Sequence, residues 1–174
     1  MATLTLPVDP ARDHLEGRAT APITLLEYGD FECPHCRQAH PIVEEVRQAM
    51  GDKVRYAYRH FPLRQMHPHA QLAAEAAEAA AMQGKFWEMH HALFEQAGEL
   101  DEALIQQLAE KLELDTEQFR QDLDNGTYTE RVQEDFSSGV RSGVNGTPTF
   151  FINGKRHDGS FDKESLLAAL DQAG

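Results

Sequence analysis

The sequence has few cysteines, few basic residues and no long apolar run. Only two of its 174 residues are cysteine, which excludes a secreted scaffold held by many disulfide bridges. Its 16 Lys and Arg residues face 29 Asp and Glu residues, a net charge of −13. Neither nucleic acid nor an anionic membrane is attracted to an acidic surface. No apolar run approaches the ~20 residues that cross a bilayer. We therefore expect a globular protein with neither nucleic acid nor membrane as partner.

The first ten residues, MATLTLPVDP, contain no Lys or Arg, and Pro7 and Asp9 interrupt their apolar character. They lack the basic region and the apolar stretch of a secretory signal. The expectation from this start is a cytoplasmic protein. An exported protein whose signal had been removed would begin in the same way.

The order of apolar patterns predicts an α/β fold. Residues 23–31 are a short apolar run typical of a buried strand, and residues 54–61 alternate apolar and basic positions as a second strand. Between them, a helix is expected from Pro34, which suits a first turn, to Gly51, which supplies a stop. A strand–helix–strand order predicts a parallel pair of strands.

A helical stretch follows over residues 68–140, and the chain then returns to strands. Within the stretch, Asp115 is expected to cap a helix. Residues 147–154 read as an apolar strand, and Asn153-Gly154 is a strong signal for a hairpin turn. Asp162 is expected to cap a closing helix. The helical stretch lies between two strand regions, so we interpret it as an insert.

The motif Cys33-Pro34-His35-Cys36 stands between the first strand and the first helix and holds both cysteines. Covalent haem attachment would need a histidine directly after the second cysteine, where Arg37 stands. Two inert buried cysteines are the plain alternative, although a C-x-x-C at a strand-to-helix junction is not an ordinary core feature. The remaining use is redox chemistry.

Zinc would need further ligands beside the two cysteines. His35 and His40 are near in sequence, but on a straight helix both would point away from a site shared with the cysteines. Four other histidines could donate only from afar. We interpret them as packing or capping residues, because His is often partly buried without a chemical role: they are His67, His69, His90 and His91.

The position of Cys33 at a helix N-terminus favours its thiolate, the reactive form of cysteine. A protonated His35 would add positive charge nearby. Cys36 lies one helical turn further on, so its sulfur can reach back to Cys33, and the pair can close and reopen a disulfide.

The CPHC motif and the order of elements from residue 21 onward resemble the DsbA family of thiol–disulfide oxidoreductases. The resemblance implies a thioredoxin-like fold with an inserted all-helical domain. We predict a thioredoxin-like domain formed by residues 18–65 and 140–174, a helical insert over residues 66–139, and an N-terminal extension over residues 1–17.

Residue by residue, the resemblance implies further site positions. Glu27 matches the acidic residue beneath the second cysteine, with a role in tuning or shuttling the proton of Cys36; a charged residue at a sheet edge is its other reading. Pro41 matches a kinking proline of the first helix. Pro148 matches the family's cis-proline facing the cysteines, and Thr147 before it would offer backbone hydrogen bonds to a substrate peptide.

The expected function is therefore exchange of a Cys33–Cys36 disulfide with thiol- or disulfide-containing proteins, peptides or small molecules. No cofactor or metal is expected, and a further redox partner of unknown identity is implied. Two alternatives stay open: a glutathione-linked isomerase or transferase on the same fold, and a non-catalytic peptide- or zinc-binding module. The paired cysteines disfavour the isomerase. Oxidation, reduction and isomerisation are not distinguished by the motif.

Overall fold

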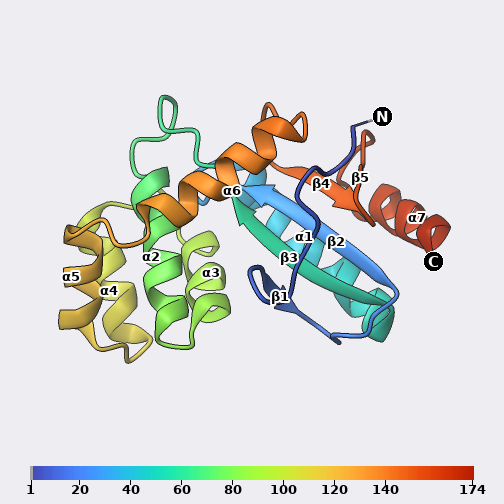
Figure 1. Ribbon diagram of the computed structural model, residues 1–174. Helices are drawn as coiled ribbons and strands as arrows, with labels where there is room; N and C mark the ends of the chain where they lie inside the picture. Colours follow the sequence, from blue (N-terminus) through green and yellow to red (C-terminus); the bar gives the residue numbers. More distant parts are fainter. Residues whose placement is uncertain (1) are drawn as a thin grey trace.

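The computed structural model describes residues 2–174 as a five-stranded sheet with helices on both faces and a cluster of helices at one end (Figure 1). The strand order is β1-β3-β2-β4-β5. The strands are β1 (His14–Glu16), β2 (Ile23–Gly29), β3 (Val54–His60), β4 (Thr149–Ile152) and β5 (Lys155–Arg156). The helices are α1 (Pro34–Met50), α2 (Ala70–Met82), α3 (Phe86–Phe94), α4 (Glu102–Lys111), α5 (Thr116–Asp124), α6 (Thr129–Arg141) and α7 (Lys163–Ala173). Among these residues, no helix combines the length and apolar character needed to span a bilayer.

Strand pairing brings three chain segments together at one end of the sheet, where β2 and β3 end and β4 begins. Strands β2 and β3 pair in parallel, as predicted, with Gly29 opposite His60 at their carboxyl ends. Strand β4 runs antiparallel to β2, so its first residue, Thr149, lies opposite Tyr28 near the same end. The loop after β2 and the loop before β4 are therefore neighbours, although more than a hundred residues separate them.

Helix α1 begins and ends where its terminal residues predict. Cys33 is the N-cap and keeps an extended backbone, and Pro34 occupies the first turn, where a missing N–H costs nothing. At the other end Gly51 has φ 55°, a left-handed conformation that glycine adopts without steric strain. The buried side of the helix includes Cys36 and Ala39, followed by three apolar residues, Val43, Val46 and Met50.

The predicted turn and cap residues elsewhere are confirmed. Asn153 and Gly154 both have positive φ and join β4 to β5, which pair antiparallel. The carboxylate of Asp115 accepts a hydrogen bond from the backbone N–H of Gln118 at the start of α5. Asp162 accepts the corresponding bond at the start of α7. Strand β5 after this turn has only two residues, so the hairpin is short.

The sheet separates two apolar clusters. On one face, side chains of β2 and β3 pack with α1 and α7, in a cluster that continues into the helical insert. The other face, with Leu26, Ala57 and Phe151, is covered by the N-terminal segment and α6. Gly139 of α6 lies against Phe61: a Cβ at this glycine would come within 2.7 Å of the ring. The close approach of α6 to the sheet therefore requires glycine there.

The insert consists of α2 to α6, between β3 and β4, as the resemblance implied. Helix α2 lies among α3, α5 and α6 and buries seven alanines, which allow the neighbouring helices to approach closely. In Figure 1 these helices extend from one end of the sheet, and α6 crosses back over it toward β4.

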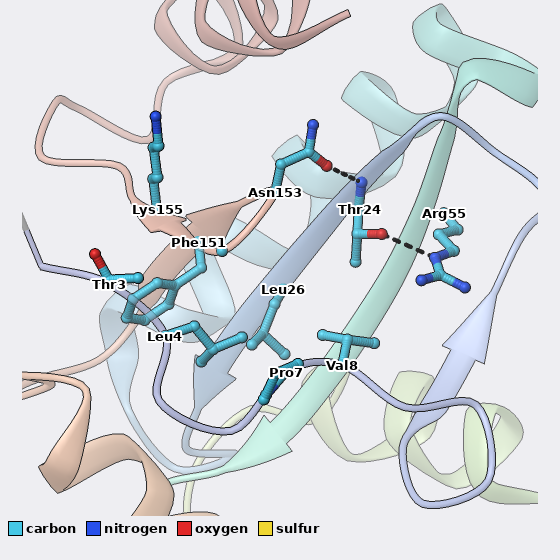
Figure 2. A pocket seen from close by; sticks show the side chains of 11 residues that line it. Thr3, Leu4, Pro7, Val8, Thr24, Leu26, Arg55, Phe151, Asn153 and Lys155 are labelled. Carbon is cyan, nitrogen blue, oxygen red and sulfur yellow. Dashed lines mark hydrogen bonds between the residues drawn. The ribbon is translucent and has the colours of Figure 1, made fainter.

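The N-terminal segment belongs to the sheet, which the sequence analysis did not foresee. Residues 14–16 form the edge strand β1, antiparallel to β3. Figure 2 shows the segment lying across the sheet, with Leu4 and Val8 beside Leu26 and Phe151 in the wall of a pocket of about 310 Å³. Neither cysteine lines this pocket.

A buried ion pair anchors this segment. Arg59 of β3 is fully buried, and its guanidinium donates two hydrogen bonds, of 2.8 and 2.9 Å, to the carboxylate of Asp13. It also donates to the hydroxyl of Tyr28 and to the carbonyl of Pro7. Every one of these partners depends on the N-terminal segment or the neighbouring strand being in place.

We predict that Asp13→Asn lowers the free energy of unfolding by about 3–5 kcal/mol, because it leaves the Arg59 charge buried without a counter-charge. The control is Asp158→Asn, which removes a half-exposed partner of Arg156 and should cost less than about 1 kcal/mol. Urea unfolding of the two variants measures both values. Equal losses of unfolding free energy in the two variants would show that the buried ion pair stabilises the fold no more than the exposed one.

Candidate active site

The two cysteines lie at the end of the sheet where the loop after β2 meets the loop before β4. Cys33 is 4% exposed, and its Sγ lies 3.6 Å from the carbonyl oxygen of Thr147, to which the protonated thiol donates. Cys36, in the first turn of α1, is fully buried beneath it. Both residues are thiols, so the structure represents the dithiol form. Pro34 and His35, between them, are exposed.

The pKa of Cys33 is lowered to about 5. The largest cause is a hydrogen bond from the thiol of Cys36, which outweighs the opposing effect of burial. Thr147 and the backbone N–H groups of Cys36 and His35 contribute further. The helix N-terminus thus acts as the sequence predicted, but the main donor is the second thiol, and His35 contributes through its backbone while its ring is exposed.

The pKa of Cys36 moves in the opposite direction, well above its ordinary value. Burial is the main cause, and the hydrogen bond to Cys33 and the charge of Glu27 add to it. At neutral pH one proton is therefore held on Cys36 and the negative charge on Cys33. This division of protons leaves the reactive thiolate form on Cys33.

Glu27 lies in the central strand β2, not at a sheet edge, and is 2% exposed. The hydroxyl of Tyr56 donates a 2.6 Å hydrogen bond to its Oε1. Burial raises the pKa of Glu27 to about 8, although the Tyr56 bond lowers it in part. Tyr56 was not identified from the sequence as a site residue, because its position beside Glu27 depends on the register of β2 against β3.

Thr147 and Pro148 form the opposite wall of the site. The peptide bond between them is cis, and β4 begins at the next residue. The Thr147 hydroxyl is buried and has no hydrogen-bond partner within the described part of the chain. It contributes to the lowered pKa of Cys33 and partly opposes the raised pKa of Cys36.

The residue before the motif, Glu32, has a structural role that the sequence did not show. Its carboxylate is 9% exposed and accepts hydrogen bonds from the backbone N–H of His69, at 2.7 Å, and of Leu100, at 2.9 Å. Arg37, after the motif, donates to the carbonyls of Phe31 and Gly98. The motif is thus fastened to the helical insert on both sides.

The metal-capable clusters of the described residues include neither cysteine. One consists of His40, His90 and His91, and the other of Glu16, Glu44 and His91.

A thioredoxin-like sheet with a helical insert and a cysteine pair at its end defines a class of redox proteins. A sequence profile described as Thioredoxin matches residues 10–172, and the chain belongs to this family.

Several curated relatives are larger proteins than this chain. Na⁺/H⁺ antiporter NhaA 1 of Salinispora arenicola is 51% identical over 170 residues, and NhaA of Herminiimonas arsenicoxydans is 43% identical over 165. These matches cover 98% and 95% of this chain but 26% of each relative. The chain thus spans about a quarter of the length of these relatives.

Solved structures confirm the DsbA-like fold. A thioredoxin-like oxidoreductase from Silicibacter pomeroyi has 31% identity and a TM-score of 0.84, covering 95% of this chain and 93% of its own. BdbD from Bacillus subtilis has 22% identity and a TM-score of 0.86, covering 99% and 97%. Wolbachia pipientis alpha-DsbA1 has 24% identity and a TM-score of 0.83, covering 98% and 94%. The similarity to BdbD and to alpha-DsbA1 is a similarity of fold.

We predict that alkylation of Cys33 by iodoacetamide follows a midpoint near pH 5, and that Cys36→Ala shifts this midpoint clearly upward, because it removes the strongest hydrogen-bond donor to the thiolate. Cys36→Ser is the matched control, since its hydroxyl still donates and should keep the midpoint low. A wild-type midpoint above pH 8, or the same midpoint in all three proteins, would contradict this assignment.

We predict that Glu27→Gln stabilises the dithiol protein at neutral pH. The native pKa near 8 exceeds the ordinary 4.5, so the folded protein holds a proton that the unfolded chain releases. The contribution of Glu27 to wild-type stability is then greatest below pH 4.5 and falls as pH rises toward 8. The difference in free energy of unfolding between the variant and the wild type should be about 3 kcal/mol more in favour of the variant at pH 7 than at pH 4. Urea unfolding across pH measures this, with the exposed Glu45→Gln as control. A pH-independent difference would refute the raised pKa.

Proposed function

We propose that the chain is a thiol–disulfide oxidoreductase that exchanges a Cys33–Cys36 disulfide with protein, peptide or small thiol substrates. The observation that carries the proposal is the opposite shift of two adjacent thiols. Cys33 is ionised and meets the loop of Thr147, whereas Cys36 is protonated and shielded behind it. A purely structural cysteine pair has no need for this division.

In the oxidising direction, a substrate thiolate attacks Sγ of Cys33 in the disulfide. The Cys33–Cys36 bond breaks, a bond between the substrate sulfur and Cys33 forms, and Cys36 leaves with the electron pair and takes up a proton. A second substrate thiolate then attacks the substrate sulfur and releases Cys33 as a thiolate. The substrate is oxidised by two electrons and the cysteine pair is reduced. The reverse sequence reduces a substrate disulfide.

Glu27 supports the step at Cys36. Its carboxyl is buried, and its charge is one cause of the raised pKa of Cys36, so the two groups are electrostatically coupled. With a pKa near 8, Glu27 can both accept and return a proton near neutral pH. It therefore provides a destination for the Cys36 proton when Cys36 must become the attacking thiolate.

Substrate chains would lie along the loop before β4. Thr147 supplies backbone groups beside the Cys33 sulfur, and Pro148 lines an open pocket of about 280 Å³. The pocket continues past the β4–β5 hairpin over a mixture of apolar and charged residues: Asn145, Thr149, Phe150, Arg156, His157, Asp158, Gly159 and Phe161. An extended peptide bound there would present its sulfur to Cys33.

The low pKa of Cys33 supports the oxidising direction. It stabilises the dithiol form at pH 7 by at most about 3 kcal/mol, equivalent to about 60 mV toward a more oxidising potential. The predicted compartment remains the cytoplasm. Thiols are kept reduced there, which favours the reducing direction. Equilibration with glutathione buffers reports the potential directly.

We predict that Cys36→Ala accumulates mixed disulfides through Cys33, while Cys33→Ala accumulates none. Without Cys36 the covalent intermediate has no internal thiol to resolve it, and without Cys33 the ionised nucleophile is missing. Each variant is incubated with a reduced single-thiol peptide and glutathione disulfide and analysed on nonreducing gels and by mass spectrometry.

The same experiment separates the alternatives. A cysteine-independent isomerase would retain its activity in both variants. A zinc-held binding module would trap no peptide in either variant and would lose metal in both. Equal trapping in both variants would overturn the assignment of Cys33 as the nucleophile.

A further inference from the structure

Three histidines gather on the side of α1 that faces the helical insert. His40 lies one helical turn after Cys36, and His90 and His91 are neighbours in α3. One ring nitrogen from each lies within 4.8 Å of the others. We propose that His40, His90 and His91 bind a divalent transition-metal ion of the Zn²⁺ class. The site is separate from the cysteine pair and from the exchange reaction proposed above.

The buried ring of His90 requires an explanation. This side chain is 1% exposed, and neither its Nδ1 nor its Nε2 has a hydrogen-bond partner among residues 2–174. Buried polar groups in proteins are nearly always bonded, because an unsatisfied one costs about 1–3 kcal/mol. The ring is packed against aromatic side chains, none of which hydrogen-bonds to it: Phe31, Tyr58, Trp87 and Phe94 are among them. A metal ion would be the missing partner of one ring nitrogen.

The other two histidines already point ligand atoms at each other. Nε2 of His40 lies 2.9 Å from Nδ1 of His91, which is a hydrogen bond in the structure. Tetrahedral zinc with Zn–N distances of about 2.0–2.1 Å needs nitrogens about 3.3 Å apart. Small ring rotations therefore convert this contact into two ligands. Both rings are half-buried, so an ion has a path to them from solvent.

The surroundings supply negative charge and a carboxylate beside the outer nitrogen of one ligand. Nε2 of His91 lies 3.7 Å from the carboxylate of Glu16, on the side of the ring away from His40. A closer approach of this carboxylate would complete the carboxylate–histidine–metal arrangement that orients ligand imidazoles. Glu44 adds a second carboxylate, while Arg47 offsets one of the two charges. A net negative charge remains to compensate a cation.

The ligands come from two parts of the fold. His40 belongs to the helix that begins at the cysteines, and His90 and His91 belong to the insert, so a bound ion would cross-link α1 to α3. The sequence predicts packing or capping roles for His90 and His91, and it predicts that His40 points away from a zinc site shared with the cysteines. The contact between α1 and α3 is what brings them together.

The test uses the full chain with Cys33→Ser and Cys36→Ser, so that no thiol can bind metal. Zn²⁺ binding is measured by calorimetry, and Co²⁺ serves as a visible-absorption probe of coordination. We expect one ion per chain, Co²⁺ bands that indicate nitrogen ligands in a low-coordinate geometry, and a higher melting temperature with Zn²⁺. His40→Gln should weaken binding by more than the about 10- to 100-fold expected for Glu16→Gln, the outer-shell change.

The matched control is His157→Gln, which alters a half-buried histidine just after β5 and should leave metal affinity unchanged. His40→Gln is chosen over a change at His90 because its ring is only half-buried and the variant should fold. Circular dichroism of the metal-free variant checks this, and His91→Gln takes its place if it does not fold. Absence of Zn²⁺ binding in the parent chain, or equal affinity in His40→Gln and His157→Gln, would overturn the proposal.

Discussion

The site depends on the pairing of three strands: β2 pairs in parallel with β3, and β4 pairs antiparallel with β2. Together these registers bring the start of α1 and the loop before β4 to the same end of the sheet. The contact between Cys33 and the Thr147 carbonyl follows from this arrangement, and so does the position of Tyr56 beside Glu27. A one-residue shift in either pairing would move the site side chains to the opposite face.

The chemistry of the site depends on how a buried charge is shared. Three ionisable groups lie together with little access to water, and their environments push their pKa values apart. Cys33 keeps the negative charge because Cys36 and the backbone N–H groups of the first helical turn donate to it. Cys36 and Glu27 are both shifted toward their protonated forms by burial. Separated pKa values in one site are typical of acid–base and nucleophilic function.

The helical insert is attached by polar contacts to the first turn of α1 and to the residue before the CPHC motif. Glu32 and Arg37 bind backbone groups of the insert on either side of the CPHC motif. The proposed metal site joins the same two elements one turn further along α1. These contacts fix where the insert stands relative to Cys33, so a substrate that touches the insert would also meet a defined position of the nucleophile.

Much of the fold follows from residues that act over short distances in the chain. Pro34 and Gly51 bound α1, Asp115 and Asp162 cap their helices, and Asn153-Gly154 forms the hairpin turn. Each works through a backbone conformation or a hydrogen bond within about four residues, so the local sequence determines it. The position of two thiols at a helix N-terminus is local in the same sense.

Tertiary structure alone decided the remaining features. Strand β1 has three residues and no alternating pattern long enough to recognise, and its place depends on pairing with β3. The carboxylate of Glu32 meets partners 37 and 68 residues away. His40 and His91 are 51 residues apart in sequence. Such contacts depend on register and on helix packing between distant segments, which side-chain periodicity within one segment does not encode.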